Sequence, residues 1–127
     1  MNENKISEFM NDDPVYVSGY TRIAEIKYLL SKYNLEELFV VDEDKFPIGV
    51  VSFDDVDTKD VEQMDIPSDV SAIECMRKIP SIVMNNSTLQ ETLNIMRLNR
   101  VNNLAVVDNQ GKFEGIIQKD IITKIIM

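Results

Sequence analysis

Leu38-Phe39-Val40-Val41-Asp42 and the following run Gly49-Val50-Val51-Ser52 decide the fold, because both stretches recur 66 positions later in the chain. Their counterparts are Leu104-Ala105-Val106-Val107-Asp108 and Gly115-Ile116-Ile117-Gln118. The same offset places further identical residues opposite one another: Glu8 and Glu74, Met10 and Met76, Pro14 and Pro80, Val17 and Val83, Glu25 and Glu91. Identities that preserve apolar spacing at one offset indicate an internal duplication, in which each repeat buries its apolar face against the other.

The composition is that of a compact globular domain. The chain has 127 residues, of which 44% are hydrophobic and 28% are charged, which suits one domain built from two halves. No apolar run approaches the roughly 18 residues that a membrane span needs, and the N-terminus lacks the features of a signal peptide. The single cysteine, Cys75, excludes an internal disulfide. We therefore expect a cytoplasmic protein in which Cys75 is a buried structural thiol.

The charge is distributed unevenly between the repeats. The formal net charge of −9 weighs against a nucleic-acid polymer as partner, because phosphate backbones bind clustered Lys and Arg. Residues 1–66 hold 16 acidic and 6 basic side chains, a net charge of −10, whereas residues 67–127 hold 6 acidic and 7 basic, a net charge of +1. The two repeats therefore share a pattern but differ electrically.

The apolar spacing predicts one order of elements in both repeats: helix, strand, helix, strand, strand, helix. For the first repeat we expect a helix near 6–10, a strand over 15–17 and a helix from Thr21. The inner face of that helix carries Ile23, Ile26, Leu30 and Tyr33. Strands over 38–42 and 48–52 and a short helix from Asp54 follow. This repeat spans residues 5–58, and an acidic linker follows over 59–70.

The second repeat, residues 71–127, predicts the same elements. We expect a helix over 72–76 and a strand at 82–83. A capping box, Ser87-Thr88-Leu89-Gln90, should then open a helix with the inner face Leu89, Leu93 and Met96. Strands over 104–108 and 113–117, joined by the turn Asn109-Gln110-Gly111, and a final helix complete the repeat. That helix carries Ile121, Ile122, Ile125 and Ile126, and this apolar band needs a partner surface, either the core or another subunit.

The Val-Val-Asp strand ends, the run Gly-h-h-Ser-x-x-Asp (h, hydrophobic) and the duplication resemble a tandem cystathionine-β-synthase (CBS) domain pair, or Bateman module. The resemblance covers roughly residues 5–58 and 71–126. It implies a mixed α/β (α+β) fold of two small sheets flanked by helices, packed with pseudo-two-fold symmetry. It also implies a cleft between the repeats that binds an adenosine-type ligand, and disc-shaped dimers.

The resemblance implies the roles of individual residues. In the family the carboxylate binds the ribose hydroxyls, the hydroxyl residue helps to hold phosphate, and the early strand lines the base. The first repeat matches in full, with Gly49, Ser52, Asp55 and the lining strand Val15, Tyr16 and Val17. The second repeat departs from the motif, because Gln118 and Ile121 take the hydroxyl and carboxylate positions. Its weaker candidates are Val83, Arg100, Gly115 and Asp120.

A purely structural interpretation stays open beside the ligand-binding one. Ser52-x-x-Asp55 is also a capping box, and Gly49 suits close packing of the backbone. If a ligand binds, the candidates are AMP, ADP, ATP and S-adenosylmethionine. The −10 half would repel a triphosphate, which favours AMP or the cationic S-adenosylmethionine. No cofactor is required, and no calcium loop or other metal site is expected.

An enzymatic role has little support in the sequence. The chain has no histidine, Cys75 has no partner for a nucleophilic pair, and no phosphate-loop signature occurs. We therefore expect a regulatory sensor that acts on an unknown protein partner in trans. The alternative is a dimerisation or protein-interaction module without ligand. A homodimer is expected, with head-to-tail pairing favoured because two −10 halves repel each other.

Overall fold

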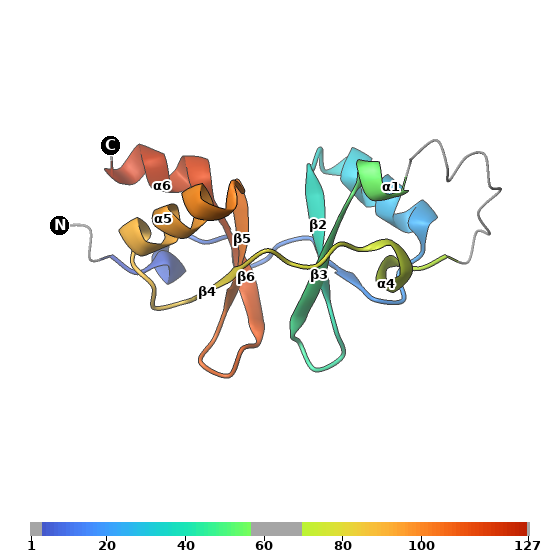
Figure 1. Ribbon diagram of the computed structural model, residues 1–127, viewed down its shortest axis with the longest axis horizontal. Helices are drawn as coiled ribbons and strands as arrows, with labels where there is room; N and C mark the ends of the chain where they lie inside the picture. The colour runs from blue at the N-terminus through green and yellow to red at the C-terminus, as the bar shows by residue number, and fades with distance from the viewer. Residues whose placement is uncertain (1–3, 57–69, 127) are drawn as a thin grey trace. The chain divides into compact units, whose positions relative to one another are not determined.

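We describe the protein from a computed structural model, in which residues 4–56 and 70–126 are placed (Figure 1). The chain forms two compact units. The first, called here the continuous unit, is Val15–Ile79; the second, called the split unit, joins Met1–Pro14 to Pro80–Met127. The linker expected over residues 59–70 lies outside the described residues, apart from Val70.

The continuous unit is a three-stranded sheet with helices packed on it. Its elements are β1 (Val17–Ser18), α1 (Ile23–Lys32), β2 (Glu37–Val41), β3 (Pro47–Ser52), α2 (Phe53–Val56) and α4 (Ala72–Cys75). The strand order is β1-β2-β3, with β1 parallel and β3 antiparallel to β2. As predicted for an apolar strand, β2 is buried from Leu38 to Val41. The core comprises Val17, Ile26, Leu30, Leu38, Val40, Val51, Val56 and Ala72.

The split unit repeats this architecture. Its elements are the 3-10 helix η1 (Ile6–Glu8), β4 (Ile82–Met84), α5 (Leu89–Asn99), β5 (Asn103–Val107), β6 (Phe113–Gln118) and α6 (Lys119–Ile126). The sheet order is β4-β5-β6, again with one parallel and one antiparallel pair. Its core comprises Ile6, Val83, Leu89, Leu93, Met96, Leu104, Val106, Ile117 and Ile122. The predicted α/β fold class is therefore confirmed.

Each unit takes its entry helix from the other sequence repeat. Ile6, from the first repeat, is fully buried in the core of the split unit. Ala72, from the second repeat, is fully buried in the continuous unit. The chain following each helix pairs with a strand: Asn11 exchanges backbone hydrogen bonds of 2.8 and 3.0 Å with Ile116, and Arg77 does so with Val50 at 2.8 and 3.0 Å. The compact units therefore exchange the first segments of the sequence repeats.

Gly49 and Gly115 lie where these exchanged segments cross a strand. A Cβ atom on Gly115 would overlap the backbone oxygen of Asn11. A Cβ on Gly49 would overlap the Met76 side chain and come within 3.0 Å of the Arg77 carbonyl oxygen. The crossing backbone excludes a side chain at Gly115, whereas a side chain at Gly49 would displace the flexible Met76 side chain and press on the crossing backbone.

The Val-Val-Asp strand ends build the two hairpin turns. Asp42 Oδ1 accepts hydrogen bonds from the backbone N–H groups of Asp44 (2.9 Å) and Phe46 (2.8 Å). Asp108 Oδ1 accepts equivalent bonds from Gln110 (2.8 Å) and Lys112 (2.9 Å). The predicted turn at Asn109-Gln110-Gly111 is confirmed, and Gly111 supplies its positive φ of 85°.

Three local predictions are corrected. Strand β1 begins at Val17 and includes Ser18, rather than covering 15–17. Tyr33 is 46% exposed because α1 ends at Lys32, which leaves its ring beyond the helix. The capping box is Thr88 with Glu91, rather than Ser87 with Gln90, because Thr88 keeps extended backbone angles and the helix begins at Leu89. By contrast, the predicted inner face of α5 is confirmed.

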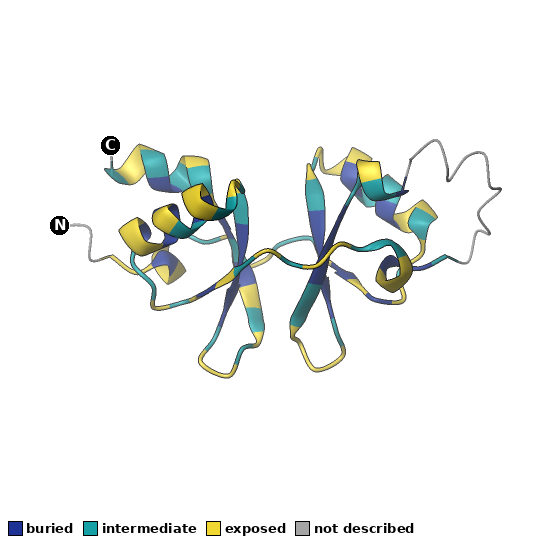
Figure 2. Cartoon of the chain, viewed as in Figure 1, coloured by how far each residue is buried: buried dark blue, intermediate teal, exposed yellow. Residues whose placement is uncertain are grey.

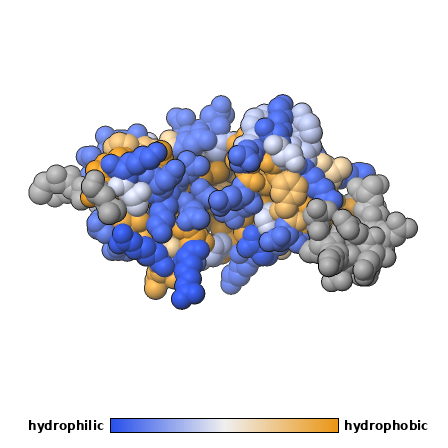
Figure 3. All heavy atoms as spheres, turned by 90° about the horizontal axis from the view of Figure 1, so that it is seen from above, coloured by the Kyte–Doolittle hydropathy of each residue, from blue (hydrophilic) through white to orange (hydrophobic). Residues whose placement is uncertain are grey.

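Buried residues lie on the strands and on the inner faces of the helices (Figure 2). In α6, Ile122 is fully buried and Ile126 packs against the core, so the split unit itself covers part of the isoleucine band; Ile125 is exposed. Hydrophilic residues cover much of the face in Figure 3, with apolar residues between them. No helix in the described part of the chain has the length and apolar character of a membrane span.

Candidate functional site

The Ser-x-x-Asp motif places two polar side chains where β3 ends and α2 begins. The Ser52 N–H donates a hydrogen bond of 2.7 Å to Asp55 Oδ2, and the Ser52 hydroxyl donates one of 3.0 Å to the same oxygen. The Asp55 side chain is only 12% exposed. These contacts fix the direction of the carboxylate and confirm that the spacing brings Ser52 and Asp55 together.

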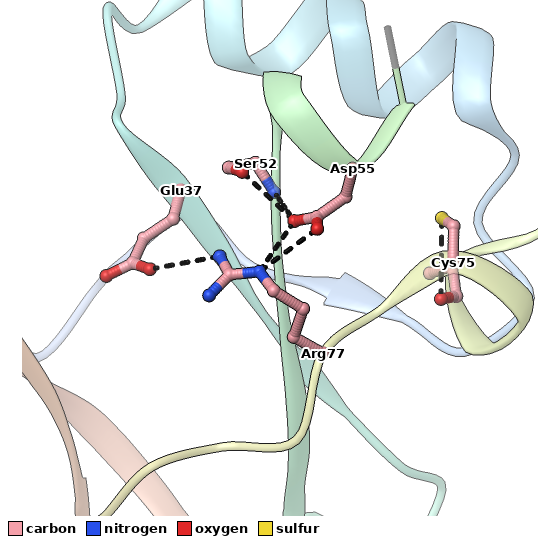
Figure 4. A network of polar contacts seen from close by, with 6 residues as sticks. Glu37, Ser52, Asp55, Cys75 and Arg77 are labelled. Carbon is pink, nitrogen blue, oxygen red and sulfur yellow. Dashed lines mark hydrogen bonds and ion pairs between the residues drawn. The ribbon is translucent and has the colours of Figure 1, made fainter. Parts of the chain in front are cut away.

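Arg77 brings a positive charge onto this carboxylate (Figure 4). Its Nε lies 3.0 Å from both Asp55 oxygens, and its Nη2 lies 4.0 Å from Glu37 Oε2. Glu37 comes from the first residue of β2, which pairs in register with Ser52. Figure 4 shows the four side chains converging from β2, β3, α2 and the segment after α4.

Arg77 and Glu37 were missed by sequence reasoning. Arg77 belongs to the second repeat, and the pattern of the repeats does not show that its segment pairs with Val50 in the continuous unit. Gly49 allows that segment to cross, so this motif glycine also places Arg77. The one available signal was the charge difference at the repeat offset, where Arg77 stands opposite the neutral Asn11.

The network orients a carboxylate rather than adding much stability. The Arg77 side chain is 53% exposed, and such partly solvated ion pairs typically contribute about 0–1 kcal/mol. A carboxylate offers about four acceptor positions, and three donor groups use Asp55 here. The arrangement can therefore present an oriented acceptor to a hydroxyl-bearing ligand once a donor moves away.

The predicted lining strand lies in the same unit but has other contacts. Val17 is buried in the core, and Val15 packs against it from a half-buried position. The Tyr16 hydroxyl accepts a hydrogen bond of 3.2 Å from Lys45 Nζ, which also lies 5.7 Å from the ring centroid. These contacts join Tyr16 to the β2–β3 turn, whereas Asp55 contacts Ser52 and Arg77.

The split unit does not repeat the charged network. At the repeat offset, the positions of Glu37, Ser52, Asp55 and Arg77 are taken by Asn103, Gln118, Ile121 and Asn11. The weaker candidates are dispersed in this unit: Val83 is buried in the core, Arg100 ends α5 in a left-handed conformation, Gly115 meets Asn11, and Asp120 is exposed in the first turn of α6. Within the described residues, no hydrogen bond or ion pair joins Arg100 to Asp120.

Cys75 lies near the network but outside it. Its thiol donates long hydrogen bonds to the carbonyl oxygens of Ser71 (3.5 Å) and Ala72 (3.7 Å) and is half-buried against the core. Burial raises the pKa of the Cys75 thiol above its ordinary value, and the negative charge of Asp55 raises that pKa further. A thiol that resists ionisation is a poor nucleophile. Among the described residues, no group of three or more Cys, Asp or Glu side chains could hold a metal ion.

Relatives of known sequence support the duplication. The CBS domain family matches this chain over residues 6–61 and again over residues 69–127. An inosine-5'-monophosphate dehydrogenase of Aquifex aeolicus is 32% identical over 114 residues, which are 88% of this chain and 22% of that protein. The same enzyme of Mycobacterium tuberculosis is 26% identical over 109 residues, which are 85% of this chain and 20% of that protein. The chain thus spans about a fifth of the length of these relatives.

Solved structures share the fold. CBSX2 of Arabidopsis thaliana, in complex with AMP, has a TM-score of 0.78 at 22% identity, over 95% of this chain and 94% of that chain. The CBS domains of a transcriptional regulator from Streptococcus pneumoniae have a TM-score of 0.82 at 11% identity, over 95% and 98% of the two chains. With its two matched segments covering nearly every residue, the chain belongs to the CBS domain family, as a pair of CBS domains.

Proposed function

We propose that this CBS domain pair is a regulatory ligand-sensing module, which binds an adenosine-type ligand through Ser52 and Asp55 and acts on a partner protein in trans. The observation that carries the proposal is the Asp55 carboxylate, which is largely buried yet held in one direction by Ser52 and Arg77. A carboxylate held in this way suits the cis-diol of a ribose, which offers two hydroxyl donors.

The candidate ligands are AMP, ADP, ATP and S-adenosylmethionine, with AMP and S-adenosylmethionine favoured. The AMP complex of CBSX2 supports an adenosine-type ligand through its similar fold. The continuous unit, residues 15–79, carries 14 acidic and 7 basic side chains, a net charge of −7, which would repel a triphosphate. Gly49, Val15, Tyr16 and Val17 remain proposed site residues, and Val83, Arg100, Gly115 and Asp120 are weaker ones. A cytoplasmic setting and a head-to-tail homodimer are part of the proposal.

A second candidate function is a ligand-free interaction module. Its support is that Ser52 and Arg77 already occupy most acceptor positions of Asp55, so the network is complete without a ligand. Exposed apolar side chains also offer contact surface, above all Leu98 on α5, which is 84% exposed. Under this alternative, Ser52 and Asp55 only support the start of α2.

A thermal-shift panel on nucleotide-stripped protein separates the two functions. A ligand at a hundred times its dissociation constant adds about 2.7 kcal/mol of stability, which is a shift of several degrees. We expect a shift with one adenosine-type ligand, its loss in Asp55→Ala, and its retention in Asp54→Ala. Asp54 is the matched control because it is the neighbouring carboxylate and is exposed. Unchanged melting with every ligand would favour the interaction module.

A further inference from the structure

The Arg77 guanidinium occupies the carboxylate to which the proposed function assigns the ligand. Asp55 Oδ2 accepts bonds from the Ser52 N–H and the Ser52 hydroxyl, and Arg77 Nε lies 3.0 Å from Oδ2 and Oδ1 alike. A cis-diol needs two acceptor positions, and a carboxylate has about four in total. Both hydroxyls can therefore bind Asp55 only if the guanidinium moves off it.

The side chain of Arg77 can move without disturbing the fold. Its backbone is held separately by the two hydrogen bonds to Val50. The side chain is half exposed, and its second contact is the 4.0 Å approach to Glu37, which is at the limit of an ion pair. Within the described residues, Nη1 makes no hydrogen bond or ion pair. The backbone of Arg77 is thus held in place, whereas the guanidinium has N–H groups available for a new acceptor and only a weak second contact, with Glu37.

A displaced guanidinium needs a new anion. Moving it from the largely buried Asp55 to water gives up the 3.0 Å contacts of Nε with the two carboxylate oxygens, and Glu37, 4.0 Å from Nη2, compensates for little of that loss. A phosphate on the incoming ligand recovers it well, because guanidinium and phosphate form bidentate hydrogen bonds. A neutral nucleoside provides no such group, and a cationic ligand adds repulsion.

We propose that Arg77 is the specificity-determining residue of this site: it holds Asp55 when no ligand is bound, and it moves to an anionic group of the ligand when the ribose diol takes Asp55. The inference rests on the proposed function and narrows its ligand to a nucleoside monophosphate, in preference to adenosine or S-adenosylmethionine. The mechanism belongs to the continuous unit, because Asn11 and Ile121 stand at the corresponding positions of the split unit.

Calorimetric titration of the full chain with AMP, adenosine and S-adenosylmethionine tests this role. For the wild type we expect AMP to bind about 10-fold or more tightly than adenosine, the range expected for hydrogen bonds to a charged group. Arg77→Gln should remove most of that preference by weakening AMP, while adenosine binds as well as before or more tightly. Lys78→Gln is the matched control, because it removes the neighbouring exposed charge and should leave the preference intact.

Each other outcome has a definite meaning. If Arg77→Gln retains the preference, if Lys78→Gln loses it equally, or if S-adenosylmethionine binds the wild type more tightly than AMP, then Arg77 does not select the ligand, although the sensor function stands. If the wild type binds none of the three, the role of Arg77 proposed here is wrong, and titration with ADP and ATP decides whether the sensor function is wrong as well. If Arg77→Gln fails to fold, Arg77→Lys decides, since it keeps the charge but loses the bidentate geometry and should give a reduced preference.

Discussion

At the scale of single residues, Asp42 and Asp55 of the first repeat differ in whether the second repeat also has an aspartate at the corresponding position. Asp42 closes its hairpin turn, and Asp108 closes the equivalent turn with the same hydrogen bonds. The backbone N–H of Lys112 lowers the pKa of Asp108, which shows how closely the turn holds that carboxylate. Asp55, by contrast, has Ile121 as its counterpart. The architecture therefore forms without a carboxylate at this position, which supports a role for Asp55 beyond helix capping.

The rate at which the Cys75 thiol reacts should depend on the charge of Asp55, so this rate tests the electrostatics of the site in an experiment that needs no ligand. Because the negative charge of Asp55 is one cause of the raised pKa of the thiol, Asp55→Asn should lower that pKa. The thiolate fraction, and with it the rate of alkylation by iodoacetamide, should then rise at neutral to mildly alkaline pH. Mass spectrometry of the full chain measures the rate.

Asp54→Asn is the control for this experiment and should leave the rate unchanged. Equal rates in wild type and Asp55→Asn would contradict the electrostatic coupling. The same raised pKa has a consequence for stability: the folded state favours the neutral thiol, so this contribution is present below the ordinary thiol pKa and declines as the pH rises through the raised value.

At the scale of elements, the start of α5 is fixed by two reciprocal hydrogen bonds. Thr88 Oγ1 accepts from the Glu91 N–H at 3.1 Å, and the Glu91 carboxylate accepts from the Thr88 N–H at 3.1 Å. Hydrogen bonding from the Thr88 side chain is the main cause of the lowered pKa of Glu91, and the hydrogen bond from the Thr88 backbone N–H lowers that pKa further. A capping box satisfies two backbone N–H groups that the helix itself cannot.

Thr88→Ala should therefore lower the free energy of unfolding by about 1 kcal/mol, the usual cost of losing an N-cap side chain. Ser87→Ala is the matched control and should have a much smaller effect, because Ser87 precedes the capping residue. Chemical denaturation measures both variants. A larger loss for Ser87→Ala would place the helix start one residue earlier, where the sequence pattern predicted it.

Local patterns were enough to predict most elements. The consecutive apolar residues of β2 and the three- to four-residue spacing of Leu89, Leu93 and Met96 determine their own burial, so these predictions are confirmed. The capping box was misplaced by one residue because Ser87 and Thr88 are chemically equivalent caps in sequence. Arg77 was missed for a different reason, since its contact with Asp55 depends on backbone pairing between residues far apart in the chain.

At the scale of the whole molecule, the sequence repeats and the compact units have different boundaries. The exchange moves Arg77 and Lys78 into the continuous unit and residues 1–14 into the split unit. The net charges become −7 for the continuous unit and −2 for the split unit, in place of −10 and +1 for the two sequence halves. In the proposed homodimer, these charges still favour head-to-tail pairing, but by less than the charges of the sequence halves would.

Ile6→Ala tests the exchange. This substitution of a fully buried residue should lower the free energy of unfolding by about 2–5 kcal/mol. The split unit should lose this stability, although Ile6 lies in the first sequence repeat. Amide hydrogen exchange should show lost protection in α5, β5 and β6, with β2 and β3 retained. Ile26→Ala, in the core of the continuous unit, should give the opposite pattern.

Equal loss of protection in both units, or loss confined to β2 and β3 in Ile6→Ala, would contradict the assignment of the entry helix to the split unit. The measurement is independent of any ligand. Its result therefore tests the architecture and does not depend on whether the proposed site binds a ligand.

The exchange also bears on the order in which the chain folds as it is synthesised. Domains generally fold as units, the N-terminal one first. Here Ile6 and Asn11 are synthesised before the continuous unit but belong to the unit that is completed after it, because Asn11 pairs with Ile116. The continuous unit has all its strands and its entry helix once Ile79 has left the ribosome. During translation, Ile6 and Asn11 must therefore remain without their native partners while the continuous unit folds.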